Sequence, residues 1–175
     1  NRTEQKTDMQ NKEKALLARI DEITRQDLCL AFSGGVDSSL LLKLVMDASA
    51  KHGTKVYAVT FQTRLHPPCD LETATRVAKE VGAVHEVLFV DELEQEAIRY
   101  NPENRCYLCK HHLFGKLLEF ARDHGVTQVL DGTNEDDLHV YRPGRKALRE
   151  YGVISPLAAC HAVSYTHLRA HETGR

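Results

Sequence analysis

The sequence lacks several features that would place it in a class at once. Its 175 residues carry a formal net charge of only −2, so there is no global basic field of the kind that binds nucleic acid. It contains no apolar run of the ~18 residues that a membrane-spanning helix needs. Its polar, charged N-terminus does not have the pattern of a secretory signal. These absences predict a protein without a nucleic-acid or membrane partner.

Cysteine and histidine are present but do not form an obvious cluster. Five cysteines without a secretory segment predict reduced thiols and a cytoplasmic location. The ten histidines are scattered, which argues against a dedicated histidine metal site. Cys29 lies inside an apolar run and is expected in the core, whereas Cys69 and Cys160 receive no role. A hydrophobic content of 42% fits one globular domain with a sizeable core.

The most informative segment is the string Ser33-Gly34-Gly35-Val36-Asp37-Ser38. It follows a short apolar run at 28–32 and precedes an apolar stretch of helical character at 39–50. A strand, a glycine-rich turn and a helix in this order present unpaired backbone N–H groups to an anion. The string therefore predicts a phosphate-binding loop at residues 33–38.

Each residue type in this loop suits a phosphate chain. Gly34 and Gly35 allow a tight turn and a close backbone approach, and Ser33 and Ser38 add hydroxyl donors. Asp37 would repel a phosphate unless a cation lay between them, so we interpret it as a Mg²⁺ ligand. The alternative is an ordinary helix N-cap after a buried strand, since Asp and Ser are common in first turns. No Gly-Lys-Ser/Thr follows, so this is not a Walker A loop.

The remaining pattern alternates strands with helices. It predicts strands at 28–32, 55–60, 85–90 and 127–130, with a fifth beginning at 153–154. It predicts helices at 37–51, 71–81 and 108–124, preceded by an amphipathic helix around 16–23 and a frayed arm at 1–8. This order indicates an α/β fold, a doubly wound parallel sheet of about five strands, with ligands at the carboxyl ends of the strands.

A second informative segment, at 101–110, carries Cys106 and Cys109 as C-x-x-C at a predicted helix start. The helix dipole and the flanking basic residues favour the thiolate form. The spacing leaves three interpretations open: metal or cluster binding, redox or persulfide chemistry, or cysteines without a role. Two cysteines complete neither a zinc site nor a cluster. His111 and His112 are the nearest further ligands, but adjacent helical residues point in different directions.

A third segment runs from Asp131-Gly132-Thr133 through an acidic stretch to a basic one. Gly132 and Thr133 follow a predicted strand end, where their N–H groups could donate to pyrophosphate. Arg142 and Arg145 could hold an anionic substrate, or could offset the preceding acidic run. The acidic run itself could be no more than a solvated loop.

Several of these motifs have counterparts in a known superfamily. The string S-G-G-V-D-S resembles the PP-loop of the ATP pyrophosphatases, enzymes that split ATP between its α and β phosphates. The further motifs narrow the resemblance: N-P-E-N-R-C-Y-L-C-K at 101–110, D-G-T-N-E-D-D at 131–137, Y-R-P-G-R-K-A at 141–147 and V-I-S-P-L at 153–157. Together they resemble the LarE family, the ATP-dependent sulfur transferases of nickel-pincer cofactor synthesis that serve lactate racemase. The resemblance covers about 16–158 and implies an adenine nucleotide alpha hydrolase-like fold.

The resemblance implies a reaction in two steps. ATP, held with Mg²⁺ at Asp37, would adenylylate a carboxylate of pyridinium-3,5-biscarboxylic acid mononucleotide and release pyrophosphate. A sulfur donor would then displace AMP and leave a thiocarboxylate. Some family members sacrifice a cysteine sulfur, and others hold a [4Fe–4S] cluster with three cysteines. The resemblance assigns Cys106 and Cys109 to such a cluster, with a third cysteine that has no counterpart here.

The resemblance also implies an organisation for the chain. Residues 1–158 would form the PP-loop domain, and 159–175 lose all pattern and are expected to be a non-native tail. The C-terminal region for substrate binding and sulfur transfer is expected to be absent, and the full-length protein is expected to be a homo-oligomer. Four rival interpretations remain: a PP-loop enzyme that thiolates tRNA, an amide-forming ligase such as NAD or GMP synthetase, a non-catalytic nucleotide-binding module, and an inactive fragment. The low net charge weighs against tRNA.

Overall fold

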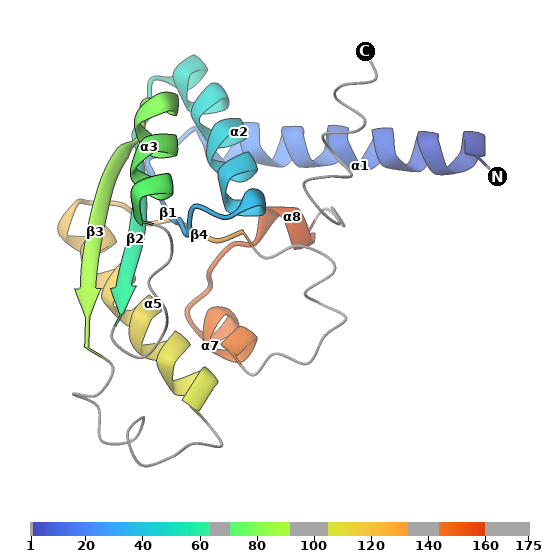
Figure 1. Cartoon of the computed structure of the whole chain (residues 1–175). Helices are drawn as coiled ribbons and strands as arrows, with labels where there is room; N and C mark the ends of the chain where they lie inside the picture. Colours follow the sequence, from blue (N-terminus) through green and yellow to red (C-terminus); the bar gives the residue numbers. More distant parts are fainter. Residues whose placement is uncertain (1, 64–70, 92–104, 133–143, 160–175) are drawn as a thin grey trace.

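The computed structural model of the chain describes residues 2–63, 71–91, 105–132 and 144–159 (Figure 1). Within these residues, four hydrogen-bonded strands form one sheet in the order β3-β2-β1-β4. Each pairing is parallel. The strands are β1 (Leu28–Ala31), β2 (Val56–Thr63), β3 (Val84–Val90) and β4 (Val129–Leu130). This arrangement confirms the predicted α/β fold with a parallel sheet.

Helices cover both faces of this sheet, as a doubly wound topology requires. The described helices are α1 (Arg2–Ile23), α2 (Val36–His52), α3 (Leu71–Val81), α5 (Arg105–Asp123), α7 (Gly144–Glu150) and α8 (Pro156–Ala159). One core cluster joins the sheet to α1, α2, α3 and α8. The other joins it to α5 and α7. No helix among the described residues is both long and apolar enough to cross a bilayer.

The alternation of side chains along β1 explains the two cores. Leu28 and Leu30 point to the α1–α3 face, whereas Cys29 between them points to the α5 face. All three are fully buried. Full burial of a leucine stabilises the fold by about 1.5–3 kcal/mol. Burial of Leu28 and Leu30 therefore stabilises β1 in its central position between β2 and β4.

Two expected segments take a different form in the structure. The expected frayed arm at 1–8 is helical from Arg2 onward, because good helix formers extend α1 beyond the buried positions Leu16 and Ile20. The N-terminal part of α1 extends away from the sheet (Figure 1). The expected fifth strand appears as a single parallel bridge between Leu130 and Ile154, rather than as a strand of its own.

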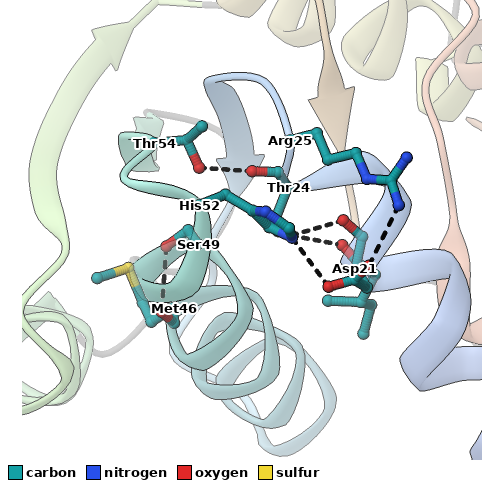
Figure 2. A network of polar contacts seen from close by, with 8 residues as sticks. Asp21, Thr24, Arg25, Met46, Ser49, His52 and Thr54 are labelled. Atoms are coloured by element: carbon teal, nitrogen blue, oxygen red, sulfur yellow. Dashed lines mark hydrogen bonds and ion pairs between the residues drawn. The ribbon is translucent and has the colours of Figure 1, made fainter.

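A polar network holds the C-terminal ends of α1 and α2 together (Figure 2). His52 Nε2 lies 2.9 Å from Asp21 Oδ1, and Arg25 is 3.7 Å from the other carboxylate oxygen. The hydrogen bond with His52 lowers the pKa of Asp21. Thr54 Oγ1 donates to the carbonyl of Thr24 at 2.6 Å. This network lies at the C-terminal end of α2, whereas the residue 33–38 loop lies at its N-terminal end.

Candidate functional site

The loop between β1 and α2 has the backbone geometry that its glycines predict. Gly34 has a φ of +80°, which L side chains rarely adopt. A Cβ at this position would lie 3.2 Å from the backbone N and Cα of Ala74 in α3. Both observations favour glycine, because a larger residue would strain the backbone at this φ and would crowd the backbone of Ala74 in α3.

The two loop serines are joined across the turn. Ser33 Oγ lies 3.0 Å from Ser38 Oγ and accepts the N–H of Gly35 at 3.2 Å. Ser38 Oγ also contacts the Gly35 carbonyl at 3.3 Å. Ser38 is buried and Ser33 is exposed. The structure therefore brings together the predicted residues Ser33, Gly35 and Ser38 in one compact turn.

The N-terminus of α2 is arranged as an anion site would be. Its N-cap is Gly35, with φ −72° and ψ 172°, which has no side chain to cap the first-turn amides. The first intrahelical bond from the turn is the N–H of Ser39 to the Gly35 carbonyl, at 2.9 Å. The earlier amides of an α-helix have no intrahelical acceptor, and their partial positive charge attracts an anion. Asp37, in the same turn and partly exposed, could hold a divalent cation against that anion.

The carboxyl end of β4 lies beside this loop. A Cβ on Gly132 would lie 3.2 Å from Ser38 Cα and 3.3 Å from Ser38 N, so the two backbones are in close contact. Because β1 and β4 are neighbours whose chains continue to opposite faces of the sheet, this is the topological switch point at which ligands bind in such folds. The structure therefore places Gly132, which follows a predicted strand end, directly beside the residue 33–38 loop.

Asp131, which precedes Gly132, is held by the segment after α7. Its N–H donates to the carbonyl of Ile154 at 3.0 Å, and Ser155 Oγ donates to its Oδ1 at 2.5 Å. Asp131 is only 7% exposed, so its carboxylate depends on protein donors such as Ser155. The sequence does not predict that Ser155 holds Asp131, because the two residues are 24 positions apart and no local pattern connects them.

The predicted cysteine pair lies at the start of α5, as its motif indicates. Cys106 and Cys109 fall within the first five residues of the helix, and their side chains lie outside the described part of the structure. His111, the nearest further ligand in the sequence, contacts the C-terminal end of α7 and the residue after it: its Nε2 is 3.7 Å from Glu150 and its Nδ1 is 3.1 Å from the Tyr151 hydroxyl. Among the described residues, no group of three metal-ligating side chains gathers.

Other predicted site residues are not placed. Thr133 and Arg142 lie outside the described residues, and of Arg145 only the backbone is described, in α7. Cys29 is a core residue as expected: it is fully buried, and burial raises the pKa of its thiol to about 12. It therefore has no part in the site.

Several known sequences are similar to this chain. A family described as a PP-loop domain matches residues 5–105. The uncharacterized protein slr1717 of Synechocystis sp. is 40% identical over 129 residues, which cover 74% of this chain and 47% of that protein. Pyridinium-3,5-bisthiocarboxylic acid mononucleotide synthase of Lactiplantibacillus plantarum is 33% identical over 83% of this chain and 51% of its own length. The chain thus spans about half the length of these curated relatives.

Solved structures share the fold. The NH3-dependent NAD synthetase of Campylobacter jejuni superposes with a TM-score of 0.66 at 17% identity, over 94% of this chain and 73% of that one. The U34-tRNA thiolase NcsA of Methanococcus maripaludis, solved with its [4Fe–4S] cluster, has a TM-score of 0.54 at 15% identity, over 71% of this chain and 47% of that one. At such identities the likeness concerns the fold alone.

Proposed function

Because the chain belongs to the PP-loop domain family, we propose that it is the nucleotide-binding part of an ATP-dependent sulfur transferase. Its substrate would be pyridinium-3,5-biscarboxylic acid mononucleotide, one carboxylate of which becomes a thiocarboxylate in nickel-pincer cofactor synthesis. The observation that carries this proposal is the 33% identity to a relative named as the synthase of the bisthiocarboxylic acid, over 83% of the chain. The geometry of the loop supports its first half-reaction.

In that half-reaction a substrate carboxylate oxygen attacks the α-phosphorus of ATP, and the bond to the bridging oxygen breaks. The products are an acyl adenylate and pyrophosphate. The amides at the start of α2, with Ser33, Ser38 and Gly132 close by, would stabilise charge on the departing pyrophosphate. Asp37 would hold Mg²⁺, which supplies further charge neutralisation. The carboxylate becomes a good electrophile only once its oxygen can leave as AMP.

The second half-reaction is expected to involve the helix that carries the cysteine pair. Cys106 and Cys109, one turn apart at the start of α5, are the proposed ligands of a [4Fe–4S] cluster, which would supply a sulfide for transfer. Two ligands do not complete such a cluster, so a third cysteine is part of the proposal. Thr133, Arg142 and Arg145 are proposed contacts to the pyrophosphate and to the anionic substrate.

The role of Asp37 is tested by its amide. We expect Asp37→Asn to lose Mg²⁺-dependent binding of AMP-PNP, measured by titration calorimetry, while its circular dichroism stays that of the wild type. The matched control is Asp47→Asn, which removes an exposed carboxylate from the same helix and should bind as the wild type does. Equal binding by all three proteins would refute the metal assignment.

The cysteine pair is tested by anaerobic reconstitution with iron and sulfide. We expect Cys106→Ala and Cys109→Ala each to lose the visible absorption of the cluster, because each would supply one ligand. Cys29→Ala, which removes a buried thiol on the same core face as α5, should leave cluster uptake unchanged and cost about 1 kcal/mol of stability. Full absorption in either of the first two variants would disprove ligation.

The alternative functions differ in which substrate triggers the release of pyrophosphate from ATP. A tRNA-thiolating enzyme of the same fold would release pyrophosphate with tRNA, rather than with the pyridinium dicarboxylate, and the net charge of −2 disfavours it. An inactive nucleotide-binding fragment would bind AMP-PNP but release pyrophosphate with neither. Assaying both substrates with ATP and Mg²⁺ therefore separates all three. A cytoplasmic location and a homo-oligomeric full-length protein remain part of the proposal.

A further inference from the structure

A network of two hydrogen bonds, buried at Thr60 and partly exposed at His85, connects the residue 33–38 loop to β3. Thr60 in β2 is completely buried, and its Oγ1 donates to the carbonyl of Phe32 at 2.8 Å. The same Oγ1 lies 2.8 Å from His85 Nε2 in β3. Phe32 is the last residue before Ser33, so the final acceptor of this network is the carbonyl of the first peptide of the loop.

The hydrogen atoms of this network have only one consistent arrangement. A hydroxyl has one hydrogen, and a carbonyl can only accept, so the Thr60 hydrogen points to Phe32. His85 Nε2 must then be the donor to Thr60 Oγ1. Burial lowers the pKa of His85, while Glu86 opposes that shift; a neutral ring with its hydrogen on Nε2 satisfies the contact. His85 thereby fixes the direction of the Thr60 hydroxyl.

The consequence for the loop follows from the planarity of the peptide bond. In a trans peptide the C=O of Phe32 and the N–H of Ser33 point in opposite directions. The N–H of Phe32 donates to Val59 O at 2.8 Å, and its carbonyl is held by Thr60, so both groups face β2. The N–H of Ser33 is therefore aimed away from β2. Since β4 is the neighbour of β1 on that side, this amide faces the switch point where Gly132 meets Ser38.

We propose that Thr60 and His85 are positioning residues that fix the direction of the Ser33 amide for a bound phosphate chain. This inference rests on the proposed function, because it assigns the amide to nucleotide binding. Neither side chain contacts the nucleotide in this account. Both act through the Phe32–Ser33 peptide, and the backbone that follows it lies close to α3, where Gly34 approaches Ala74.

The test uses one peptide bond that can be observed alone. Phe32–Ser33 is the only Phe-Ser pair in the sequence, so labelling with ¹³C-carbonyl phenylalanine and ¹⁵N-serine gives a single cross-peak in an HNCO spectrum. We expect Thr60→Val and His85→Phe to shift this cross-peak and to weaken AMP-PNP binding by at least about fivefold, since ~1 kcal/mol of lost preorganisation corresponds to such a ratio. His85→Phe retains a ring for the edge contact with Phe32, which protects the fold.

Two rescue variants and one control complete the design. Thr60→Ser keeps the hydroxyl and His85→Gln restores an N–H donor, so both should bind more tightly than their apolar counterparts. Thr54→Val removes a similar side-chain hydrogen bond, to Thr24, at the other end of α2 (Figure 2). It should lower stability without moving the cross-peak or the dissociation constant.

The outcomes separate the two proposals. If the wild type binds AMP-PNP while Thr60→Val and His85→Phe bind equally well, the positioning role is wrong and the proposed nucleotide site stands. An unmoved cross-peak in both variants would also overturn the positioning role. If the wild type itself fails to bind AMP-PNP, the proposed function and this inference are overturned together.

Discussion

A pair of glycine substitutions tests the close contact between the loop and α3. Gly34 and Gly82 both have φ of +80°, but a Cβ on Gly34 would lie 3.2 Å from the backbone of Ala74, whereas a Cβ on Gly82 would meet nothing within 4 Å. Because the two φ angles are equal, alanine should incur similar backbone strain at either site. The difference between Gly34→Ala and Gly82→Ala isolates the contact with α3.

Two effects set the expected loss of stability: backbone strain, which both variants share, and the contact with α3, which only Gly34→Ala disturbs. The left-handed conformation costs alanine about 1–2 kcal/mol at both positions, and its effect on the unfolded chain is also shared. Forcing a methyl group against a backbone adds about 1–3 kcal/mol at Gly34 alone. We therefore expect Gly34→Ala to be the less stable variant by about 1–3 kcal/mol, or roughly 2–12 °C in Tm for a chain of this size.

Urea denaturation followed by far-ultraviolet circular dichroism measures this difference. The same proteins should be titrated with AMP-PNP, because Gly34→Ala displaces the loop and Gly82→Ala does not. Equal free energies of unfolding for the two variants would refute the close packing of the loop on α3. Undiminished nucleotide binding by a folded Gly34→Ala protein would refute the need for this loop geometry.

Three further predictions concern groups outside the loop. Ser155→Ala removes a donor to the buried carboxylate of Asp131 and should cost about 1.5–3 kcal/mol in urea denaturation, more than Ser49→Ala, whose hydroxyl donates to the Met46 carbonyl; equal losses would contradict the account. The lowered pKa of Asp21 means that its contribution to stability is present above the ordinary Asp pKa and is lost as the pH falls through its folded-state value. Asp21→Asn should therefore flatten the pH dependence of stability below about pH 4, and a profile identical to that of the wild type would argue against the His52 contact. The thiol of Cys29, with a pKa of about 12, should resist iodoacetamide at pH 8 in the folded protein and react in urea, as peptide mapping by mass spectrometry would show; equal labelling in both conditions would mean that Cys29 is accessible.

Local patterns predicted most of the described architecture. The apolar run before Ser33 corresponds to β1 and the stretch after it to α2, because strand burial and helix periodicity are both visible in short windows. The start of α1 was missed because its early residues have no apolar period. The bridge at Ile154 was predicted as a strand because two apolar residues do not reveal how far pairing continues.

The contacts that shape the site could not be predicted in the same way. Gly132 meets Ser38, Thr60 meets Phe32, and Ser155 meets Asp131 only once the strands are in register. A glycine after a strand or a threonine within a strand can serve many purposes, and the sequence does not say which backbone it will approach. The loop residues themselves were predictable because their chemistry is contained in six consecutive positions.

Phosphate binding by the turn between β1 and α2 is the proposal on which the others depend. A crystal structure of the protein with AMP-PNP and Mg²⁺ tests it most directly. We expect the triphosphate to lie against the amides of residues 33–38, with the metal beside Asp37 and with Gly132 at the edge of the site. A nucleotide bound elsewhere, or an empty loop at a saturating concentration of AMP-PNP, would contradict it.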